Sequence, residues 1–564
     1  MSSGGSGSGD WWRGAVIYQV YPRSFADSDA DGVGDLPGLI GRLDHVASLG
    51  MDAIWICPFY PSPQRDFGYD VVDHCAVDPR QGTLADADRL IAAAHARGLR
   101  VLLDLVGGHT SDLHPWFQAG RRSRTAPTAD WYVWADPAPD GTPPNNWLSV
   151  FGGSAWTWEP RRRQYYLHHF LPSQPTLNLH CEEVVEALLS IARFWLDRGA
   201  DGFRLDAVDF LTHDPALRSN PAAAPWGGVV PPKLFALQDH RHDMIQPDTL
   251  PVLRRLRALL DEYPGAVALG EVSSQDGAYE RIAGYTAGDG LLHMAYTLQP
   301  LRHGFDHPTV AALLGDAIAT CAQGGWPCFS FSNHDVERAA SRWAPKGPDG
   351  AGVPDPRLTR LLLALLLTLP GSACLYQGEE LGLPDAVLRV EEIRDPFGIA
   401  YWPEFKGRDG SRTPMPWRAW GHQAGFTAGT PWLPVPEAHR PLAVDAQEAA
   451  GPGSALGACR ALLRLRREEP ALRAGAAAPL ALDAPLLGFV RRDPGLAGGR
   501  DVTLVFNLSD APAPLPAAVA GGLAPLAAGE GAGPSGAVLP AWGFAALAAP
   551  AAPSRAVAEP ALAK

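Results

Sequence analysis

Three carboxylates that each end an apolar segment of the chain could act together in acid–base and nucleophilic chemistry. They are Asp206 in GFRLDAV, Glu271 in VALGEV and Asp335 in SNHD. Any one of them alone could equally be a capping residue. Carboxylates that are held close together shift each other's pKa, and such an arrangement is found mainly where chemistry uses it. Two carboxyl groups on opposite sides of a bond, with aromatic neighbours, indicate hydrolysis of a glycosidic bond.

Other reaction classes fit the sequence less well. Phosphoryl transfer commonly uses a phosphate-binding P-loop, and the chain has no such pattern. Metal-assisted hydrolysis commonly uses clustered histidines such as HExxH, which are also absent from the sequence. No GxGxxG follows an apolar segment, which argues against a dinucleotide-binding fold.

Eight apolar segments alternate with longer helical patterns and would position the three carboxylates. They do not alternate between apolar and polar residues, as expected of parallel strands that are buried on both faces. This order predicts an α/β fold, a (β/α)8 barrel, in which the strand ends surround one axis and one small ligand. The segments are 15–21, 52–57, 100–106, 202–208, 267–272, 291–296, 327–331 and 372–377.

The connections between these segments are uneven. Residues 110–178 are rich in Trp, Pro and Gly and predict an inserted subdomain after the third strand. Long loops at 211–248 and 378–422 would deepen a pocket on the catalytic face of the barrel. The predicted domains are a flexible head 1–10, a barrel formed by 11–109 and 179–474, a C-terminal all-β domain 475–550 and an Ala-rich tail 551–564.

The composition excludes several classes of protein. The 564 residues are 46% hydrophobic and carry a net charge of −14, so the chain is not intrinsically disordered, and nucleic acids and anionic membranes are poor partners. We find no signal peptide and no membrane span in the sequence and therefore expect a cytoplasmic protein. The seven cysteines are scattered, which predicts neither a disulfide framework nor a zinc site. The oligomeric state stays open.

Seven motifs in chain order resemble the α-amylase family of glycoside hydrolases (family 13), in the branch of bacterial α-glucosidases and oligo-1,6-glucosidases. The resemblance covers about residues 11–470. It implies the barrel, the inserted subdomain and a retaining exo-α-glucosidase that forms a covalent glucosyl-enzyme. Some members transfer glucose to a sugar or alcohol acceptor. The motifs are GYD (68–70), DLVGGH (104–109), GFRLDAV (202–208), GEV (270–272), SNHD (332–335), YQGEELGLP (376–384) and GRDGSRTPMPW (407–417).

The resemblance also implies a role for each matching residue. Asp206 would be the nucleophile, Glu271 the general acid and then the base, and Asp335 would hold sugar hydroxyls. Arg204 would keep Asp206 ionised. The remaining sugar contacts would come from Tyr69, Asp70, His109, His334 and Arg412, with Tyr69 stacking on the sugar.

The acceptor side is less strongly determined by the sequence. Phe151 and Phe170, in the inserted segment, are predicted walls of the acceptor site. A small residue after the nucleophile, here Ala207, goes with α-1,4 linkages in related glucosidases, whereas Val goes with α-1,6 linkages. We therefore expect maltose-type substrates, with a dedicated α-glucosyltransferase or a sucrose-active enzyme as the alternative. An inactive barrel that acts as a binding module is the alternative from another class, and the three carboxylates argue against it.

An acidic loop near the N-terminus predicts a metal site. Carboxylates at alternate positions, with a glycine at the turn, resemble the first half of an EF-hand loop, although Gly38 stands where the EF-hand has its bidentate Glu. Related glucosidases bind calcium in this loop, which implies one structural Ca2+. The alternative is a solvated acidic turn. The predicted ligands are Asp27, Asp29, Asp31, the Val33 carbonyl and Asp35.

Two residues depart from the family pattern. Gly108 stands where the family usually has Asn, and Thr176 stands where it usually has Asp. In true α-amylases that Asn helps to bind a calcium ion beside the inserted domain, so we expect no such ion here.

Overall fold

The structure is a computed structural model that describes residues 10–224, 233–273, 277–299, 304–346, 352–495, 499–520, 524–528 and 538–549. The predicted tail 551–564, and all of the predicted head except Asp10, lie outside the described residues.

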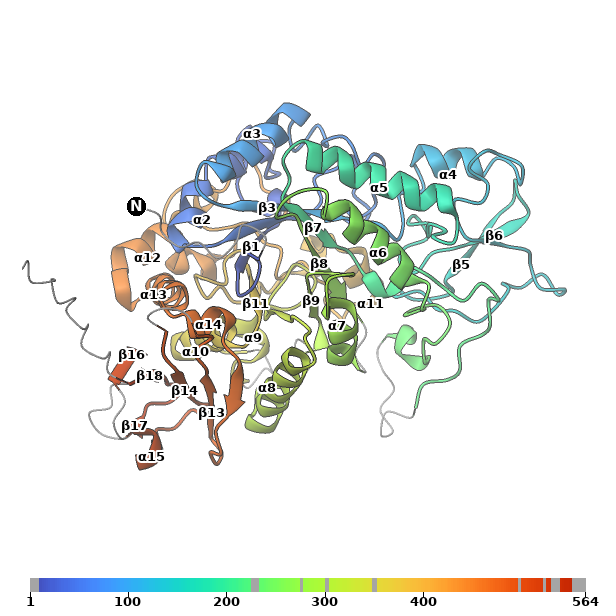
Figure 1. The fold of residues 1–564 in the computed structure, drawn as a ribbon. Helices are drawn as coiled ribbons and strands as arrows, with labels where there is room; N and C mark the ends of the chain where they lie inside the picture. The colour runs from blue at the N-terminus through green and yellow to red at the C-terminus, as the bar shows by residue number, and fades with distance from the viewer. Residues whose placement is uncertain are drawn as a thin grey trace, which may run out of the picture.

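Eight parallel strands form a ring at the centre of the molecule (Figure 1). Their order is β10-β11-β1-β2-β3-β7-β8-β9, and a single parallel bridge from Ala295 to Pro327 joins β9 to β10. The predicted (β/α)8 barrel is therefore confirmed. The strands are β1 (Val16–Val20), β2 (Ala53–Ile56), β3 (Arg100–Leu105), β7 (Gly202–Leu205), β8 (Val267–Val272), β9 (Met294–Thr297), β10 (Cys328–Ser330) and β11 (Ser372–Tyr376).

Successive side chains of these strands pack into two separate apolar clusters. Ile17, Trp55 and Leu102 belong to the smaller cluster, which takes residues from seven of the eight strands. Their neighbours Tyr18 and Ile54 belong to the larger cluster, which also contains the helices. Because both faces are buried, the strands carry apolar residues at nearly every position.

Helices cover the outer face of the ring. Helix α3 begins with a capping box formed by Thr83 and Asp86, and α5 turns one apolar face, including Trp195, toward the strands. The main helices are α1 (Leu36–Ile40), α2 (Leu43–Leu49), α3 (Leu84–His95), α5 (Glu182–Asp197), α6 (Thr249–Leu260), α7 (Ala278–Thr286), α8 (His307–Ala322), α9 (Ala339–Arg342), α10 (Pro356–Thr368), α11 (Pro396–Tyr401), α12 (Val444–Ala450), α13 (Ala455–Glu468) and α14 (Pro470–Ala474).

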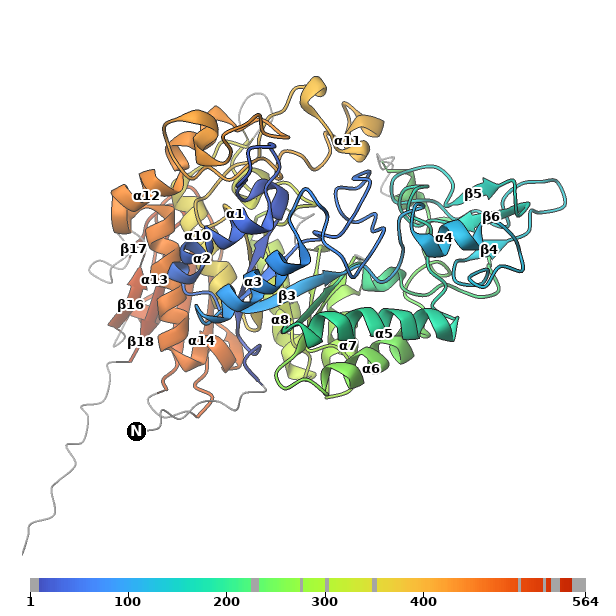
Figure 2. The same ribbon diagram turned by 90° about the horizontal axis from the view of Figure 1, so that it is seen from above.

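Two smaller units lie on opposite sides of the barrel (Figures 1 and 2). The inserted segment contains α4 (Pro115–Gly120) and an antiparallel sheet in the order β4-β6-β5. The C-terminal segment contains the five-stranded sheet β12-β13-β14-β18-β16, which confirms an all-β unit there. The exact domain boundaries stay predictions. The strands are β4 (Trp134–Ala135), β5 (Trp156–Glu159), β6 (Gln164–Leu167), β12 (Ala477–Pro479), β13 (Leu486–Arg491), β14 (Val502–Asn507), β16 (Ala524–Ala528) and β18 (Phe544–Ala548).

Within the described residues, no helix is both long and apolar enough to cross a bilayer. The expected cytoplasmic location stays a prediction.

Candidate active site

One arginine connects the ends of four barrel strands. Arg204 on β7 is fully buried, and its Nη1 donates to Asp104 Oδ1 and to Asp206 Oδ1, each at 2.8 Å. Its Nη2 donates to Glu271 Oε2 on β8 and to the Tyr296 hydroxyl on β9, the latter at 2.9 Å. The barrel thus brings two of the three predicted catalytic carboxylates together on a single guanidinium.

The charges around this arginine do not balance. Three carboxylates share one guanidinium, so the cluster carries an excess negative charge if all three are ionised. Burial raises the pKa of Glu271, while Arg204 opposes that rise. Burial also raises the pKa of Asp206, which Arg204 lowers and Glu271 raises further. Two carboxyl groups that lie this close titrate as a pair, and the ionised form of one favours the protonated form of the other.

The residue after Asp206 has a strained backbone that serves the same cluster. Ala207 has φ 41° and ψ 56°, in the left-handed region, which costs a non-glycine residue about 1–2 kcal/mol. This conformation places the Ala207 N–H 3.1 Å from Glu271 Oε2. Backbone strain of this kind is typical of functional sites.

Asp335, the third predicted catalytic carboxylate, lies between two arginines. Its Oδ1 accepts from Arg412 Nη2 at 2.9 Å and from Arg408 Nη1 at 3.0 Å. Burial alone would raise the pKa of Asp335, but His334, Arg408 and Arg412 lower it well below its ordinary value. Because burial lowers the pKa of His334 to about 3, the His334 ring is neutral near pH 7. The two arginines therefore keep Asp335 ionised.

His334 is enclosed by protein groups. Gln19 Nε2 lies 2.8 Å from His334 Nδ1, so Nδ1 accepts and Nε2 carries the proton of the neutral ring. The Nε2 atom itself lies 3.2 Å from Asp335 Oδ2. The ring stacks on Tyr69 at 5.2 Å and on Tyr21 at 5.6 Å. Tyr69 also donates to Asp104 Oδ2 at 3.0 Å. The predicted stacking of Tyr69 on a sugar stays a prediction, and its ring partner in this structure is His334.

His109 connects the barrel to the inserted segment. Its Nε2 lies 2.9 Å from the Tyr69 carbonyl and 3.2 Å from Gln174 Nε2, and burial lowers the pKa of His109 to about 3. The His109 ring lies 5.1 Å from Phe170, which in turn lies 6.4 Å from Phe151. The two predicted acceptor-site residues therefore neighbour each other and a predicted sugar ligand.

Asp70 does not fit the sugar contact that the motif GYD implied. Its carboxylate is fully buried and accepts hydrogen bonds from Ser62 Oγ, Arg65 N and Asp66 N, at 2.6, 2.8 and 3.2 Å. These contacts hold the turn at 62–66 in place. We therefore withdraw Asp70 as a sugar ligand, because its carboxylate has no exposed surface and its hydrogen bonds lie within the turn.

Asp66 and Arg408 join the site instead, although neither is among the residues predicted from the sequence. Arg408 Nη2 donates to Asp66 Oδ1 and to Asp395 Oδ1, each at 2.8 Å, while its Nη1 binds Asp335. Burial would raise the pKa of Asp395, but Arg408 lowers it to about 2. The motif GRDGSRTPMPW carries a signal for Arg408, because it contains two arginines and only Arg412 is among the predicted sugar contacts.

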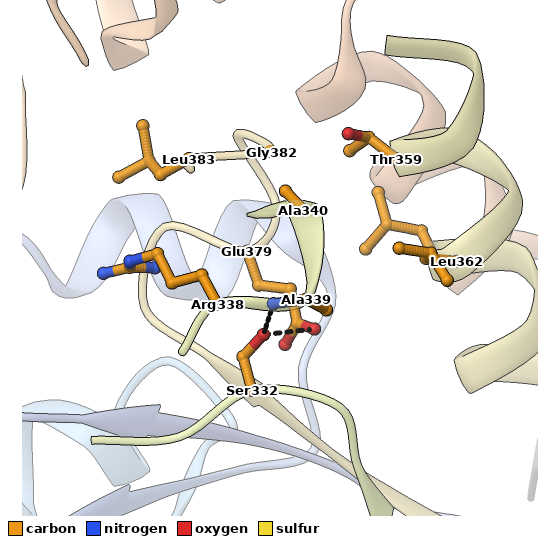
Figure 3. A pocket seen from close by; sticks show the side chains of 10 residues that line it. Ser332, Arg338, Ala339, Ala340, Thr359, Leu362, Glu379, Gly382 and Leu383 are labelled. Atoms are coloured by element: carbon orange, nitrogen blue, oxygen red, sulfur yellow. Dashed lines mark hydrogen bonds between the residues drawn. The ribbon is translucent and has the colours of Figure 1, made fainter. Parts of the chain in front are cut away.

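A small cavity of ≈ 10 Å³, about the volume that one water needs, lies behind the SNHD segment (Figure 3). Ser332 Oγ donates to Glu379 Oε1 at 3.1 Å and accepts from the Ala339 N–H at 3.0 Å. Burial raises the pKa of Glu379 to about 7. This group supports the segment that carries His334 and Asp335.

The acidic loop gathers three of the predicted metal ligands. Oxygen atoms of Asp27, Asp29 and Asp35 lie within 4.8 Å of one another. Hard oxygen donors at this spacing fit a hard divalent cation. Asp31 is outside this group, and burial together with the neighbouring carboxylates raises its pKa. Its role and that of the Val33 carbonyl, like the calcium ion itself, stay predictions.

Comparison with known proteins agrees with this geometry. Residues 19–475 match the α-amylase catalytic domain. The chain is 51% identical over 508 residues to a probable α-glucosidase of Rhizobium meliloti (strain 1021), covering 89% of this chain and 90% of that protein. It is 38% identical over 461 residues to an oligo-1,6-glucosidase of Heyndrickxia coagulans, covering 76% and 80%.

A solved structure is similar over nearly the whole chain. It is the crystal structure of the α-glucosyl transfer enzyme XgtA, with a TM-score of 0.88, 50% identity and coverage of 96% of this chain and 100% of that one. The chain is thus a glycoside hydrolase and belongs to the α-amylase family.

Proposed function

We propose that the protein is a retaining, exo-acting α-glucosidase that removes terminal α-linked glucose from short oligosaccharides or aryl glucosides. The observation that carries this proposal is the single guanidinium of Arg204, which contacts both Asp206 and Glu271. One of these carboxyl groups must be ionised and the other protonated for a double displacement, and two carboxyl groups that share one guanidinium suit that division.

In the first displacement, a carboxylate oxygen of Asp206 attacks the anomeric carbon. Glu271 donates its proton to the leaving glycosidic oxygen, so that the glucosyl-enzyme ester forms as the C–O bond breaks. In the second displacement, Glu271 accepts a proton from water or from an acceptor hydroxyl. That oxygen then replaces Asp206 on the anomeric carbon. Two inversions retain the α configuration.

A second group of charged side chains, around Arg408, supports recognition of one glucose unit. Asp335 and Asp66 both bind Arg408, and Asp335 also binds Arg412. These paired charges offer oriented donors and acceptors to sugar hydroxyls.

Transfer of glucose to an acceptor is the second candidate function. The similarity to an α-glucosyl transfer enzyme favours it, and the aromatic pair Phe151 and Phe170 offers an apolar wall to an acceptor. Phe397 extends that wall, since its ring lies 4.8 Å from Phe151. The linkage preference is proposed as α-1,4 because Ala207 is small.

We also propose one structural Ca2+ in the acidic loop. Asp27, Asp29 and Asp35 supply the closely spaced oxygen atoms. The loop is tied to the long segment after β11, because Thr427 Oγ1 donates to Asp27 Oδ2. The ion would therefore stabilise that segment without taking part in the reaction.

Product analysis tests the function. The enzyme should release α-glucose from p-nitrophenyl α-glucoside and from maltose, and the anomer can be followed by NMR before mutarotation. At high maltose concentration, with hydroquinone as an added acceptor, glucosylated products measure transfer against hydrolysis. Initial release of β-glucose would contradict the retaining mechanism, and the absence of glucosylated products would contradict transfer.

A further inference from the structure

A second hollow of ≈ 490 Å³ lies beside the acidic loop, formed mainly by the segment that follows the motif GRDGSRTPMPW. The catalytic cluster contributes no residue to its lining. Its size suits a small molecule, since ligand pockets commonly measure about 300–1,000 Å³. Its chemically notable lining residues are Asp27, Arg42, Arg418, Trp420 and His422.

The two arginines give the hollow a positive character. In the part of the chain that the structure describes, no carboxylate lies within ion-pair distance of Arg42 or Arg418, although the protein carries a net charge of −14. Burial, and then repulsion from Arg418, lowers the pKa of Arg42. Like charges that share a hollow without a carboxylate partner favour the binding of an anion.

Asp27, the one carboxylate in the lining, accepts hydrogen bonds within and beside the acidic loop. Asp27 accepts from Ala30 N and Gly32 N, each at 2.8 Å, from Asp29 N at 3.0 Å and from Thr427 Oγ1. These four donors, and the cation proposed in the acidic loop, oppose the negative charge of Asp27 toward the hollow. The two guanidinium groups therefore dominate the local field.

Both arginines are held in position by packing. The guanidinium of Arg42 lies over the ring of Trp417, at 4.4 Å from its centre. The stem of Arg418 packs against Gly425, where a Cβ atom would lie 3.2 Å from Arg418 Cγ. The adjoining turn is strained, because Gln423 and Ala424 have φ of 44° and 48°. Preorganised charges and local strain are features of binding sites.

The rim adds a stacking surface. Trp420 is 86% exposed, which is unusual for an indole, and it lines the same hollow as the arginine pair. An exposed aromatic ring beside a polar pocket is suited to stack on a sugar ring or another flat ligand. A phosphate monoester carries about −1.5 to −2 charges at neutral pH, which matches two guanidinium groups better than a carboxylate does.

We propose that this hollow is a second binding site, for a phosphorylated sugar whose phosphate is held by Arg42 and Arg418 and whose ring stacks on Trp420. The site is connected to the sugar pocket through one segment of chain. Arg408 and Arg412 stand at the start of this segment. Farther along it, Trp417 and Arg418 both donate backbone N–H groups to the Ala424 carbonyl, at 2.9 and 2.8 Å.

Isothermal titration of the full chain tests the proposal with three probes: sulfate, glucose and glucose 6-phosphate, at constant ionic strength. Sulfate reports the anion contact alone without precipitating calcium. Glucose 6-phosphate has no glycosidic bond for the enzyme to cleave. We expect glucose 6-phosphate to bind more tightly than sulfate, and Arg42→Gln or Arg418→Gln to weaken both by at least tenfold.

Two further variants make the test specific. Arg389→Gln removes one positive charge from an exposed arginine of the same long segment, which pairs with Glu392, and should leave both affinities unchanged. Trp420→Ala should weaken glucose 6-phosphate severalfold and leave sulfate unchanged. Equal affinities in wild type and in the Arg42→Gln/Arg418→Gln double variant would overturn the proposal, as would an absence of millimolar binding to the wild-type protein. A Trp420→Ala variant that binds glucose 6-phosphate like wild type would overturn the sugar assignment.

Discussion

The backbone N–H of Ala207 lies 3.1 Å from Glu271 Oε2, and Ala207 adopts a left-handed conformation to place it there. The residue next to one proposed catalytic carboxylate thus binds the other. This contact stabilises the ionised form of Glu271 and so opposes the burial that raises the Glu271 pKa. The geometry couples the proposed nucleophile and acid through the backbone as well as through Arg204.

Replacing Asp206 by Asn should remove nearly all turnover. The amide cannot form the glucosyl ester, so hydrolysis of p-nitrophenyl α-glucoside should fall by at least a thousandfold, an order of magnitude expected when a nucleophile is lost. Circular dichroism and the melting temperature should stay close to wild type, since the Asp206 side chain remains partly exposed. Near-normal activity of a folded variant would contradict the assigned nucleophile.

Activity should fall on the alkaline side as Glu271 loses its proton. Burial raises its pKa above the ordinary value, so the protonated acid is present below that raised pKa and is lost as pH rises through it. The pH profile of kcat/KM for maltose, which has a poor leaving group, measures this limb. An aryl glucoside with a good leaving group needs less protonation, so its alkaline limb should be weaker. Identical limbs for both substrates would argue against Glu271 as the acid.

Amide variants of Asp66 and Asp70 should affect different properties: the Asp66 variant mainly substrate turnover, and the Asp70 variant mainly stability. Asp66→Asn weakens the ion pair with Arg408 beside Asp335, so we expect kcat/KM to fall more than tenfold while the melting temperature changes little. Asp70→Asn replaces one of the two acceptor oxygens of a buried turn by an NH2 donor, so at least one of the three hydrogen bonds is lost and the main effect should be a lower melting temperature. The reverse pattern would restore Asp70 as the sugar ligand. Matched amide substitutions make each variant the control for the other.

The sequence predicted the barrel and its cluster of carboxylates well, for physical reasons. Strands that are buried on both faces must be apolar along their length, so the eight segments could be found, and the residues at their ends converge in any closed barrel. The error at Asp70 arose because a motif shows which residues are present and not which way a side chain turns. Asp66 and Arg408 lie in loops that are far apart in sequence, and only the folded chain shows that they are 2.8 Å apart.

The buried carboxyl of Glu379 should make stability depend on pH. Its pKa is raised from the ordinary 4.5 to about 7, so the folded state binds its proton more tightly than the unfolded state. The protonated carboxyl contributes about 3 kcal/mol to the free energy of unfolding. This contribution is full below about pH 4.5 and is lost as pH rises toward and through about 7. Glu379→Gln should reduce the fall in melting temperature between about pH 5 and about pH 8, and Asp385, whose pKa burial also raises to about 7, should keep part of that fall. An unchanged slope would contradict a raised pKa at this site.

Removal of calcium should lower the melting temperature without abolishing chemistry. Asp27, Asp29 and Asp35 repel one another unless a cation lies between them, and the loop is tied to the segment after β11 by Thr427. Chelation with EGTA should therefore destabilise the wild-type protein, and calcium should restore it, while Asp29→Asn should respond less to both. The exposed Asp140, whose carboxylate serves only its own turn, provides a matched control as Asp140→Asn. Equal melting temperatures with EGTA and with calcium would contradict an ion in the loop. They would leave the catalytic assignment untouched, because the Asp206 variant tests that separately.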